Sequence, residues 1–298
     1  MGQRYLLSIV IIPLFLACGR AEETTSSKVH STSFLFSKKQ LANLLTAKEQ
    51  PLPAGVVFNS PPSNLFPRVG AVSHHLLVAN IIDHYFASLK SLRKVTTFII
   101  LSPLHYPQGR LGPIAISSED WQLGTSLVAC DKACVSLICQ ALSLTEDPST
   151  FQYEHGIASL LPFIKKYFPK AQIAPLALVE ESHHLSPIDQ LASVLAQLLT
   201  QNKDYFLLLS IDFSHRAGPE LTKARDTATA RFLACPSLSK FRHLFSDNNK
   251  GLRILALLYP QLSLSESFLV CHTNSRIYLG REAENITSYF FYFWGQRH

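Results

Sequence analysis

Short runs of continuously apolar residues alternate along the chain with longer segments whose apolar residues recur at helical spacing. The short runs are typical of strands buried on both faces of a sheet, and the longer segments of helices that pack on the sheet by one side. Strands are predicted over residues 69–74, 95–103, 171–179, 205–212, 267–273 and 287–294. Helices are predicted over residues 36–48, 75–92, 131–143, 155–168, 187–201, 218–233, 236–245 and 250–259. This alternation predicts an α/β fold, a single domain with a mostly parallel central sheet flanked by helices.

The first twenty residues place one cation, Arg4, before an apolar stretch over residues 5–17. This is the layout of a secretory signal, and the stretch is too short to span a bilayer comfortably. Leu16, Ala17 and Cys18 also resemble a bacterial lipoprotein signal, in which Cys18 would carry the lipid anchor. We therefore expect an exported protein, either periplasmic or membrane-anchored as a lipoprotein. A retained anchor or a buried N-terminal helix is the alternative.

The segment over residues 21–68 lacks the pattern of the α/β domain. Residues 22–35 are polar and rich in Ser and Thr, which is typical of a tether. Five prolines between residues 50 and 68 oppose a long helix, so a loop is expected over residues 49–68. The predicted organisation is a signal peptide over residues 1–20, a tether and N-terminal extension over 21–68, and the α/β domain over 69–298.

Composition narrows the class of protein further. The 298 residues are 47% hydrophobic and 16% charged, which excludes a disordered or collagen-like chain. The formal charge is +6, but no run of Lys and Arg exceeds two residues, so nucleic acid is not expected as a partner. Five cysteines remain if Cys18 is lipidated. Those in the helix at 131–143 are expected to pack in the core, with one disulfide as the alternative.

Polar side chains follow three of the predicted strands where each strand ends. His74 follows the first strand, His105 the second, and Asp212 and His215 the strand at 205–212. In open α/β sheets, ligands bind beyond the carboxyl ends of the strands, so these side chains are expected to meet at one edge. Imidazoles and a carboxylate together suit a divalent metal such as Fe(II), Cu or Zn, and two histidines with one carboxylate suit non-haem Fe(II).

Further polar residues border this predicted site. Glu154 and His155 begin a helix and could complete the cluster, and a histidine that holds no metal could act as acid or base. His75 is expected to begin the helix that follows it, whereas His272, at the end of a later strand, could line the rim. No GxSxG, HExxH, Walker or GxGxxG motif is present, so the corresponding chemistries have no support.

Five segments in order give a family resemblance: AVSHHLLVANII, IILSPLHY, YEHGIASLLPFIKKYFP, SIDFSH and the C-terminal NSRIYLG…ENITSYFFYFW. Together, over residues 68–296, they resemble the Memo family, specifically its bacterial branch called AmmeMemoRadiSam system protein B. The resemblance implies an α/β domain related in fold to the class III extradiol dioxygenases, which use non-haem iron. It implies His74 and His105 as metal ligands, with Asp212 and His215 in the pocket, and AMMECR-type and radical-SAM proteins as associated partners.

The chain departs from the family pattern at Ser73, where proline is usual, and at the position of a cysteine. Some members add a cysteine ahead of a late helix, and here the position falls near Asn249 or Lys250 without a cysteine. A site without a thiolate binds soft metals less well. Asp212 or Asp247 could complete the ligand set instead, or the protein binds no metal tightly.

Three functions remain open at this point. The first is a metal-dependent, dioxygenase-like redox enzyme acting on a small molecule of unknown identity. In that enzyme His74, His105 and Asp212 would hold the metal, His215 would act as acid or base, and His155 and Glu154 would orient substrate or ligands. The second is a non-catalytic metal-binding or scaffold protein, and the third is a metallohydrolase.

Overall fold

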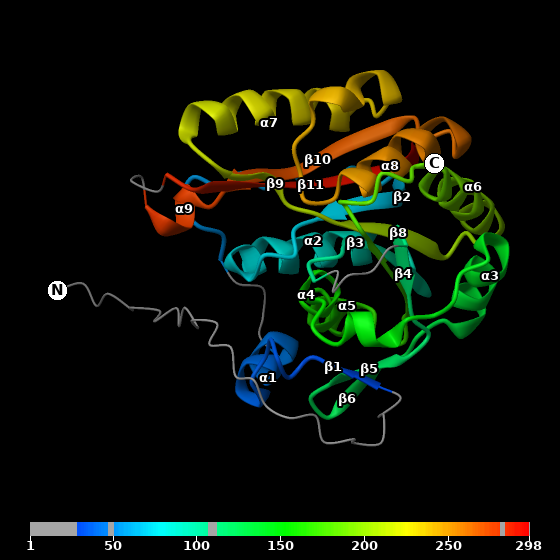
Figure 1. Ribbon diagram of the computed structural model, residues 1–298. Coiled ribbons are helices and arrows are strands. Elements are labelled where there is room, and N and C mark those ends of the chain that lie inside the picture. Colours follow the sequence, from blue (N-terminus) through cyan, green and yellow to red (C-terminus); the bar gives the residue numbers. More distant parts are fainter. Residues whose placement is uncertain (1–28, 47–50, 107–111, 281–283, 298) are drawn as a thin grey trace.

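The computed structural model describes residues 29–46, 51–106, 112–280 and 284–297, and its centre is an eight-stranded sheet with helices on both faces (Figure 1). Along one path the strands follow the order β10-β11-β2-β8-β3-β7-β4, and β9 pairs with β11. These strands are β2 (Leu65–Val72), β3 (Thr97–Pro103), β4 (Ile114–Ile116), β7 (Gln172–Leu178), β8 (Tyr205–Ser210), β9 (Phe213–Ala217), β10 (Glu266–Asn274) and β11 (Ile286–Arg297). The α/β fold with a central sheet flanked by helices is therefore confirmed.

The four central strands β2, β8, β3 and β7 are parallel, whereas the outer strands pair antiparallel. The sheet is thus mixed, and the prediction of a mostly parallel sheet holds for its centre. The closing strands β10 and β11 form a hairpin, because no helix long enough for a crossover separates them. The parallel centre matters for function, because the carboxyl ends of its strands lie at one edge.

The helices form a layer on each face of the sheet (Figure 1). Below the sheet in this view lie α1 (Lys38–Thr46), α2 (Ala79–Leu92), α4 (His155–Ala158) and α5 (Leu161–Tyr167). Against the other face pack α3 (Lys132–Leu142), α6 (Ser186–Gln201), α7 (Pro219–Ala234) and α8 (Asn249–Gln261). Shorter elements are α9 (Arg276–Leu279) and the 3-10 helices η1 (Leu76–Val78), η2 (Pro148–Phe151) and η3 (Leu238–His243).

Successive side chains of the central strands enter opposite cores. In β3, Phe98 and Ile100 pack against the layer of α2 and α5, whereas Ile99 and Leu101 pack against the layer of α6 and α8. All four are fully buried, which is why the strand reads as one continuous apolar run rather than as an alternating one. The two-sided core explains why the strands were recognisable from hydrophobicity alone.

Three element predictions were wrong. The loop expected over residues 49–68 ends early, because β2 begins at Leu65. The helix expected over 236–245 is the short η3, and the helix expected over 155–168 is divided into α4 and α5 at Leu160, just before Pro162.

The N-terminal extension also differs from the expected tether. Within it, β1 (Val29–Ser31) pairs with β5 (Asp120–Leu123), which also pairs with β6 (Ser126–Val128), so a second, three-stranded sheet was missed. Leu41 of α1 is buried in the core below the main sheet. Residues 29–46 therefore pack on the domain, while the division of the chain at residues 20 and 68 stays a prediction.

The five described cysteines are free thiols. Of the two in the helix predicted over 131–143, Cys134 is buried in the core, as expected, whereas Cys139 is only half-buried. Cys130 and Cys271 are buried as well, and Cys235 is exposed. No helix within the described ranges is long and apolar enough to cross a membrane. The signal segment and Cys18 lie outside those ranges.

Candidate metal centre

His74 lies at the centre of the site, two residues beyond the end of β2, and is buried. Its Nδ1 lies 3.0 Å from the Ser210 hydroxyl oxygen, and that hydroxyl donates to the Gly156 carbonyl oxygen at 2.5 Å. Ser210 therefore accepts a hydrogen bond from His74, which places the ring proton on Nδ1. The Nε2 lone pair of His74 is left to face the site.

His105 follows β3 and is held by Glu154. Its Nδ1 lies 2.7 Å from Glu154 Oε1, and its backbone N–H donates to Glu154 Oε2 at 2.9 Å. Glu154 begins α4 as its N-cap and also accepts the Gly156 N–H. Burial would raise the pKa of Glu154, but the hydrogen bonds from His105 outweigh burial and keep the pKa below its usual value. An ionised Glu154 fixes the ring of His105 with Nε2 as its free nitrogen, as in many metal sites.

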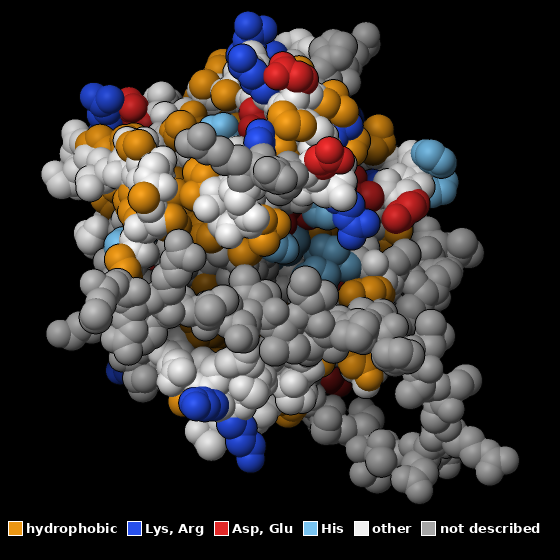
Figure 2. All heavy atoms as spheres, turned by 90° about the vertical axis from the view of Figure 1, so that its left-hand side faces the viewer, with side chains coloured by type: hydrophobic (Ala, Val, Ile, Leu, Met, Phe, Trp, Pro, Cys, Tyr) orange, Lys and Arg blue, Asp and Glu red, His pale blue; other side chains and the backbone are white. Residues whose placement is uncertain are grey.

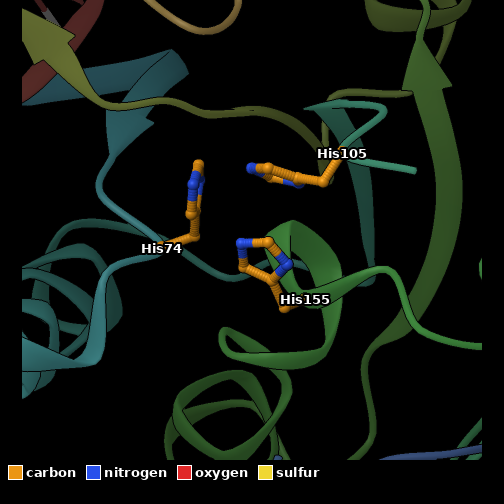
Figure 3. A group of neighbouring side chains, drawn as sticks. All are labelled: His74, His105 and His155. Carbon is orange, nitrogen blue, oxygen red and sulfur yellow. The ribbon is translucent and has the colours of Figure 1, made fainter. Parts of the chain in front are cut away.

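His155, the first residue of α4, brings a third imidazole to the same space (Figure 3). Its ring centroid lies 3.8 Å from that of His105 and 5.6 Å from that of His74. Each of the three rings offers a nitrogen within 4.8 Å of the others. Burial lowers the pKa of His155 to about 3, with a further lowering by His105 and His74. His155 is therefore neutral at physiological pH, and its lone pair is available.

Two carboxylates lie on the other side of His74, that of the buried Asp212 and that of the half-buried Asp247. The Asp212 backbone N–H donates to Asp247 Oδ1 at 2.9 Å, and the Asp247 N–H donates to the Asp212 carbonyl oxygen at 3.1 Å. The Ser73 hydroxyl donates to Asp212 Oδ1 at 2.6 Å. Asp247 Oδ2 is buried without a hydrogen-bond partner. With His74, the two carboxylates form a second group whose ligand atoms lie within 4.8 Å.

The carboxylates face the free nitrogen of His74. Its Nε2 lies 3.4 Å from Asp247 Oδ2 and 3.8 Å from Asp212 Oδ2. Burial disfavours the charged form of His74, but Asp212 and Asp247 outweigh it and raise the pKa of His74 to about 9. The Nε2 of His74 and the Oδ2 atoms of Asp212 and Asp247 repel one another at this spacing unless a positive charge lies between them. A proton or a metal ion would supply that charge. The residues therefore fit a divalent metal of the kind that imidazole and carboxylate bind.

Two carboxylates so close do not titrate alike. Burial raises the pKa of Asp212, and the charge of Asp247 adds to that rise. Burial also acts on Asp247, but His74 and the Asp212 N–H outweigh it and lower its pKa. Asp247 is thus the more acidic of the two, and its unpaired oxygen is the one nearer to His74.

The structure brings together most of the predicted site residues. His74, His105, His155 and Asp212 share one region, with Glu154 behind His105. One metal-capable group consists of His74, His105 and His155, and the other of His74, Asp212 and Asp247. The predicted ligand set combines His74, which belongs to both, with His105 from the first group and Asp212 from the second. Which residues bind a metal stays a prediction.

His215 belongs to neither of the two metal-capable groups. It belongs to β9, between Ser214 and Arg216, whose φ angles of 43° and 53° lie in the left-handed region that non-glycine residues rarely adopt. His215 instead acts on His75. Burial lowers the pKa of His75 most, and the charges of His74 and His215 lower it further. His75 itself precedes η1, as expected, and its Nδ1 lies 3.1 Å from the Tyr289 hydroxyl.

The sequence reasoning missed Asn248, whose buried side-chain amide connects two strands at the site. Asn248 donates through Nδ2 to the carbonyl oxygens of Leu101 and Ser210, 3.0 Å each, and its Oδ1 caps α8 at the Gly251 N–H. The amide thus bridges the ends of the neighbouring strands β3 and β8, from which His105 and Asp212 continue. The polar stretch before the helix at 250–259 was its only signal.

Histidine side chains gather in a recess near the middle of one face of the molecule, with acidic and basic side chains nearby (Figure 2). A match to the model of the family described as Memo-like protein covers residues 59–238, which includes His74, His105, Glu154, His155 and Asp212. The chain belongs to the Memo-like family. Asp247 lies outside the matched residues.

Curated relatives agree with this family membership. A MEMO1 family protein of Caldivirga maquilingensis is 29% identical over 146 residues, which are 48% of this chain and 50% of the relative. Another, of Pyrobaculum aerophilum, is 27% identical over 144 residues, 47% and 50% of the two chains. A third, of Thermotoga maritima, is 25% identical over 131 residues, 43% and 46% of the two chains. This Memo-like chain spans about half the length of the curated relatives it matches.

The position at which the resemblance implies a cysteine falls near Asn249 or Lys250, and Lys250 makes a structural contact there. Lys250, in the first turn of α8, is buried, and its ammonium donates to the carbonyl oxygens of Val179 and Glu180 just beyond β7. Its backbone N–H donates to Glu180 Oε1 at 3.0 Å. Lys250 thus ties α8 to the end of β7 in this family member, and Asp247, three residues earlier, supplies the anionic group near His74.

Proposed function

We propose that this protein binds one divalent transition-metal ion at His74 and uses it in dioxygenase-like redox chemistry on a small molecule. The observation that supports the site most directly is the Nε2 atom of His74, which faces two buried carboxylate oxygens at 3.4 and 3.8 Å. The second support is that Ser210 and Glu154 hold the Nδ1 atoms of His74 and His105, so both rings present Nε2.

The donor set favours Fe(II). Imidazole nitrogens with carboxylate oxygens and no thiolate suit non-haem iron when coordination positions stay open. A bound Fe(II) ion would mediate the transfer of electrons from the substrate, which is oxidised, to O₂, which is reduced, and would itself remain Fe(II) after each turnover. Copper and zinc suit imidazole as well, so the metal is an outcome of the experiment below.

The chain's own residues would divide the remaining work. His74 and His105 would hold the metal, with Asp212 and Asp247 balancing its charge. Glu154 would act as a positioning residue for His105, through the hydrogen bond at 2.7 Å. His155, neutral and beside His105, would accept a proton from a substrate hydroxyl or orient it. His215 would exchange protons at the edge of the site, from β9.

Metal content tests the proposal. The full chain, purified anaerobically without chelators, is expected to hold about one metal ion per chain by mass spectrometry. His74→Ala should abolish this occupancy, because His74 is the residue that both metal-capable groups share. His184→Ala, in an exposed loop, is the matched control and should retain the metal. Equal metal content in the two variants would contradict the proposed site.

Turnover separates the remaining functions. Oxygen consumption with catechols, lost in His74→Ala, would support the redox enzyme. Hydrolytic activity with zinc that persists without oxygen would support a metallohydrolase. Bound metal without turnover would support a metal-binding or scaffold protein.

We further propose that the protein is exported and anchored through a lipid on Cys18. The support is the order of Arg4, the apolar stretch and the Leu16-Ala17-Cys18 segment. Incorporation of labelled fatty acid into the wild type, but not into Cys18→Ser, tests the anchor. Labelling of both or neither would contradict it. Association with AMMECR-type and radical-SAM proteins stays a prediction.

A further inference from the structure

A cavity of about 390 Å³ lies between α7 and the strands β10 and β11. It shares no lining residue with the metal centre, and α7 lies on the opposite side of the sheet from α4, which carries His155 (Figure 1). Its size is at the lower end of the range for small-molecule sites. The cavity is therefore a second place in the molecule where a ligand fits.

One wall of the cavity is a hydrogen-bonded network around Asp226. This α7 residue is buried, and its Oδ2 accepts from the Ser288 hydroxyl at 2.8 Å and pairs with His272 Nε2 at 3.1 Å. The imidazole of His272 is stacked on the Phe290 ring, with 4.0 Å between centroids and 15° between planes. The hydrogen bond and the stacking together fix the plane of His272 against the wall.

Packing alone does not explain this network. A buried carboxylate opposes folding unless it is paired, and an apolar side chain at position 226 would cover the sheet equally well. Two buried polar atoms of α7 have no hydrogen-bond partner: Asp226 Oδ1 and Thr229 Oγ1. A polar wall that is fixed but incompletely paired is typical of a binding site rather than of a core.

The charges and the apolar walls indicate the class of ligand. Among the described residues, Asp226 is the only acidic one that lines the cavity, and Ser288 and His272 both bind one of its carboxylate oxygens, Oδ2. Lys223 and Arg276 line the cavity as well, and Ile286 and Phe290 contribute apolar surface. Cationic side chains beside an apolar wall favour an organic anion. We propose that this cavity binds a small organic carboxylate, with its charged end near Lys223 and Arg276 and its apolar body against the His272 wall.

Matched acids and amides test the proposal on the full-length protein. Phenylacetate, 3-phenylpropionate and hexanoate would be titrated beside their primary amides, by calorimetry and by saturation-transfer NMR. The acids are expected to bind in the millimolar range, and the amides at least threefold more weakly. Lys223→Met, at an exposed position, should weaken binding of the acids about three- to tenfold and leave the amides unchanged.

Two further variants make the test specific. Ala230→Trp places a bulky side chain from an exposed position of α7 into the cavity and should abolish binding of acids and amides alike. Arg231→Met, on the same helix but outside the lining, should leave all affinities within twofold. The titrations would be repeated in His74→Ala/His105→Ala, where a carboxylate has no metal to coordinate. Loss of binding there would overturn the proposal, because it would place the acids at the candidate metal centre instead. Equal affinity for amides, or an unaffected Ala230→Trp, would overturn it while leaving the proposed metal site untouched.

Discussion

The candidate metal centre and the α7 cavity both contain a histidine held by a buried carboxylate: His105 by Glu154 in the first, and His272 by Asp226 in the second. The charged groups around these two pairs differ. At the metal centre, the Nε2 of His74 faces the carboxylates of Asp212 and Asp247, and two more imidazoles lie beside it. Lone pairs and negative charge converge there, which requires a cation.

In the α7 cavity, the histidine and the carboxylate of the pair hydrogen-bond directly to each other. His272 lies on Asp226, Ser288 donates to the same carboxylate oxygen, and two basic side chains line the remaining space. Among the described lining residues, two are basic, Lys223 and Arg276, and one is acidic, Asp226, which favours an anion. A histidine–carboxylate pair therefore does not identify a ligand by itself, because the charged groups around the pair differ between the two regions.

The largest expected effect that sharpens this comparison is the pH dependence of metal binding. Since Asp212 and Asp247 raise the pKa of His74 to about 9, a proton occupies Nε2 at neutral pH and must leave when a metal binds. The apparent affinity for Zn²⁺ should therefore rise about tenfold per pH unit above neutral pH and level off above about pH 9. A competition titration against a chromophoric chelator measures this rise.

Asp247→Asn tests the cause of that pH dependence. Removal of one of the two charges should lower the pKa of His74, so the affinity should level off at a lower pH. The plateau affinity should also fall, because the amide is a weaker ligand or counter-charge for the metal. An unchanged profile in Asp247→Asn would show that this carboxylate does not act on His74.

An intermediate effect is expected from Glu154→Gln. The amide has nearly the shape of the carboxylate but lacks the charge that orients His105. Loss of such a contact typically lowers metal affinity roughly 10- to 100-fold. Glu220→Gln, exposed on α7, is the control and should change nothing. The same chelator titration compares the two variants, and equal affinities would remove Glu154 from its positioning role.

The smallest effect is expected on stability from Asp226→Ala. The change leaves His272 and Ser288 without their acceptor, which should lower the free energy of unfolding by about 1–3 kcal/mol. Denaturant titration measures the loss, with Glu220→Ala as the exposed control. Metal content should stay at the wild-type value. A fall in metal content would mean that the two regions are coupled.

Much of the fold could be predicted from the sequence because burial on both faces leaves a continuous apolar run. The central strands were found within a few residues for this reason, β3 at Thr97–Pro103 against a predicted 95–103. Short outer strands such as β4, with three residues, were missed because too few positions form a pattern. The irregular β9 was missed as well, since its left-handed residues interrupt any alternation.

The residues of the candidate site were also predictable only in part. His74, His105 and Asp212 were recognised because each follows an apolar strand, and parallel strands end at one edge. The role of Glu154 as the partner of His105 was not predictable in detail, because it depends on a hydrogen bond between residues 49 positions apart. Asp247 was only an alternative, since its place near His74 is set by the way α8 packs, held by Asn248 and Lys250.

The sequence by itself determined which strands are buried, that the central ones are parallel, and therefore that imidazole and carboxylate groups meet at their common edge. These properties depend on local hydrophobicity and on chain order, which the sequence contains directly. Only the tertiary structure decided which of these groups face one another. It brought Asp247, until then only an alternative, within reach of His74, left His215 out of both metal-capable groups, and placed His272 in the wall of the cavity at α7. Such contacts depend on helix packing and strand register between residues far apart in the chain, and no local pattern encodes them.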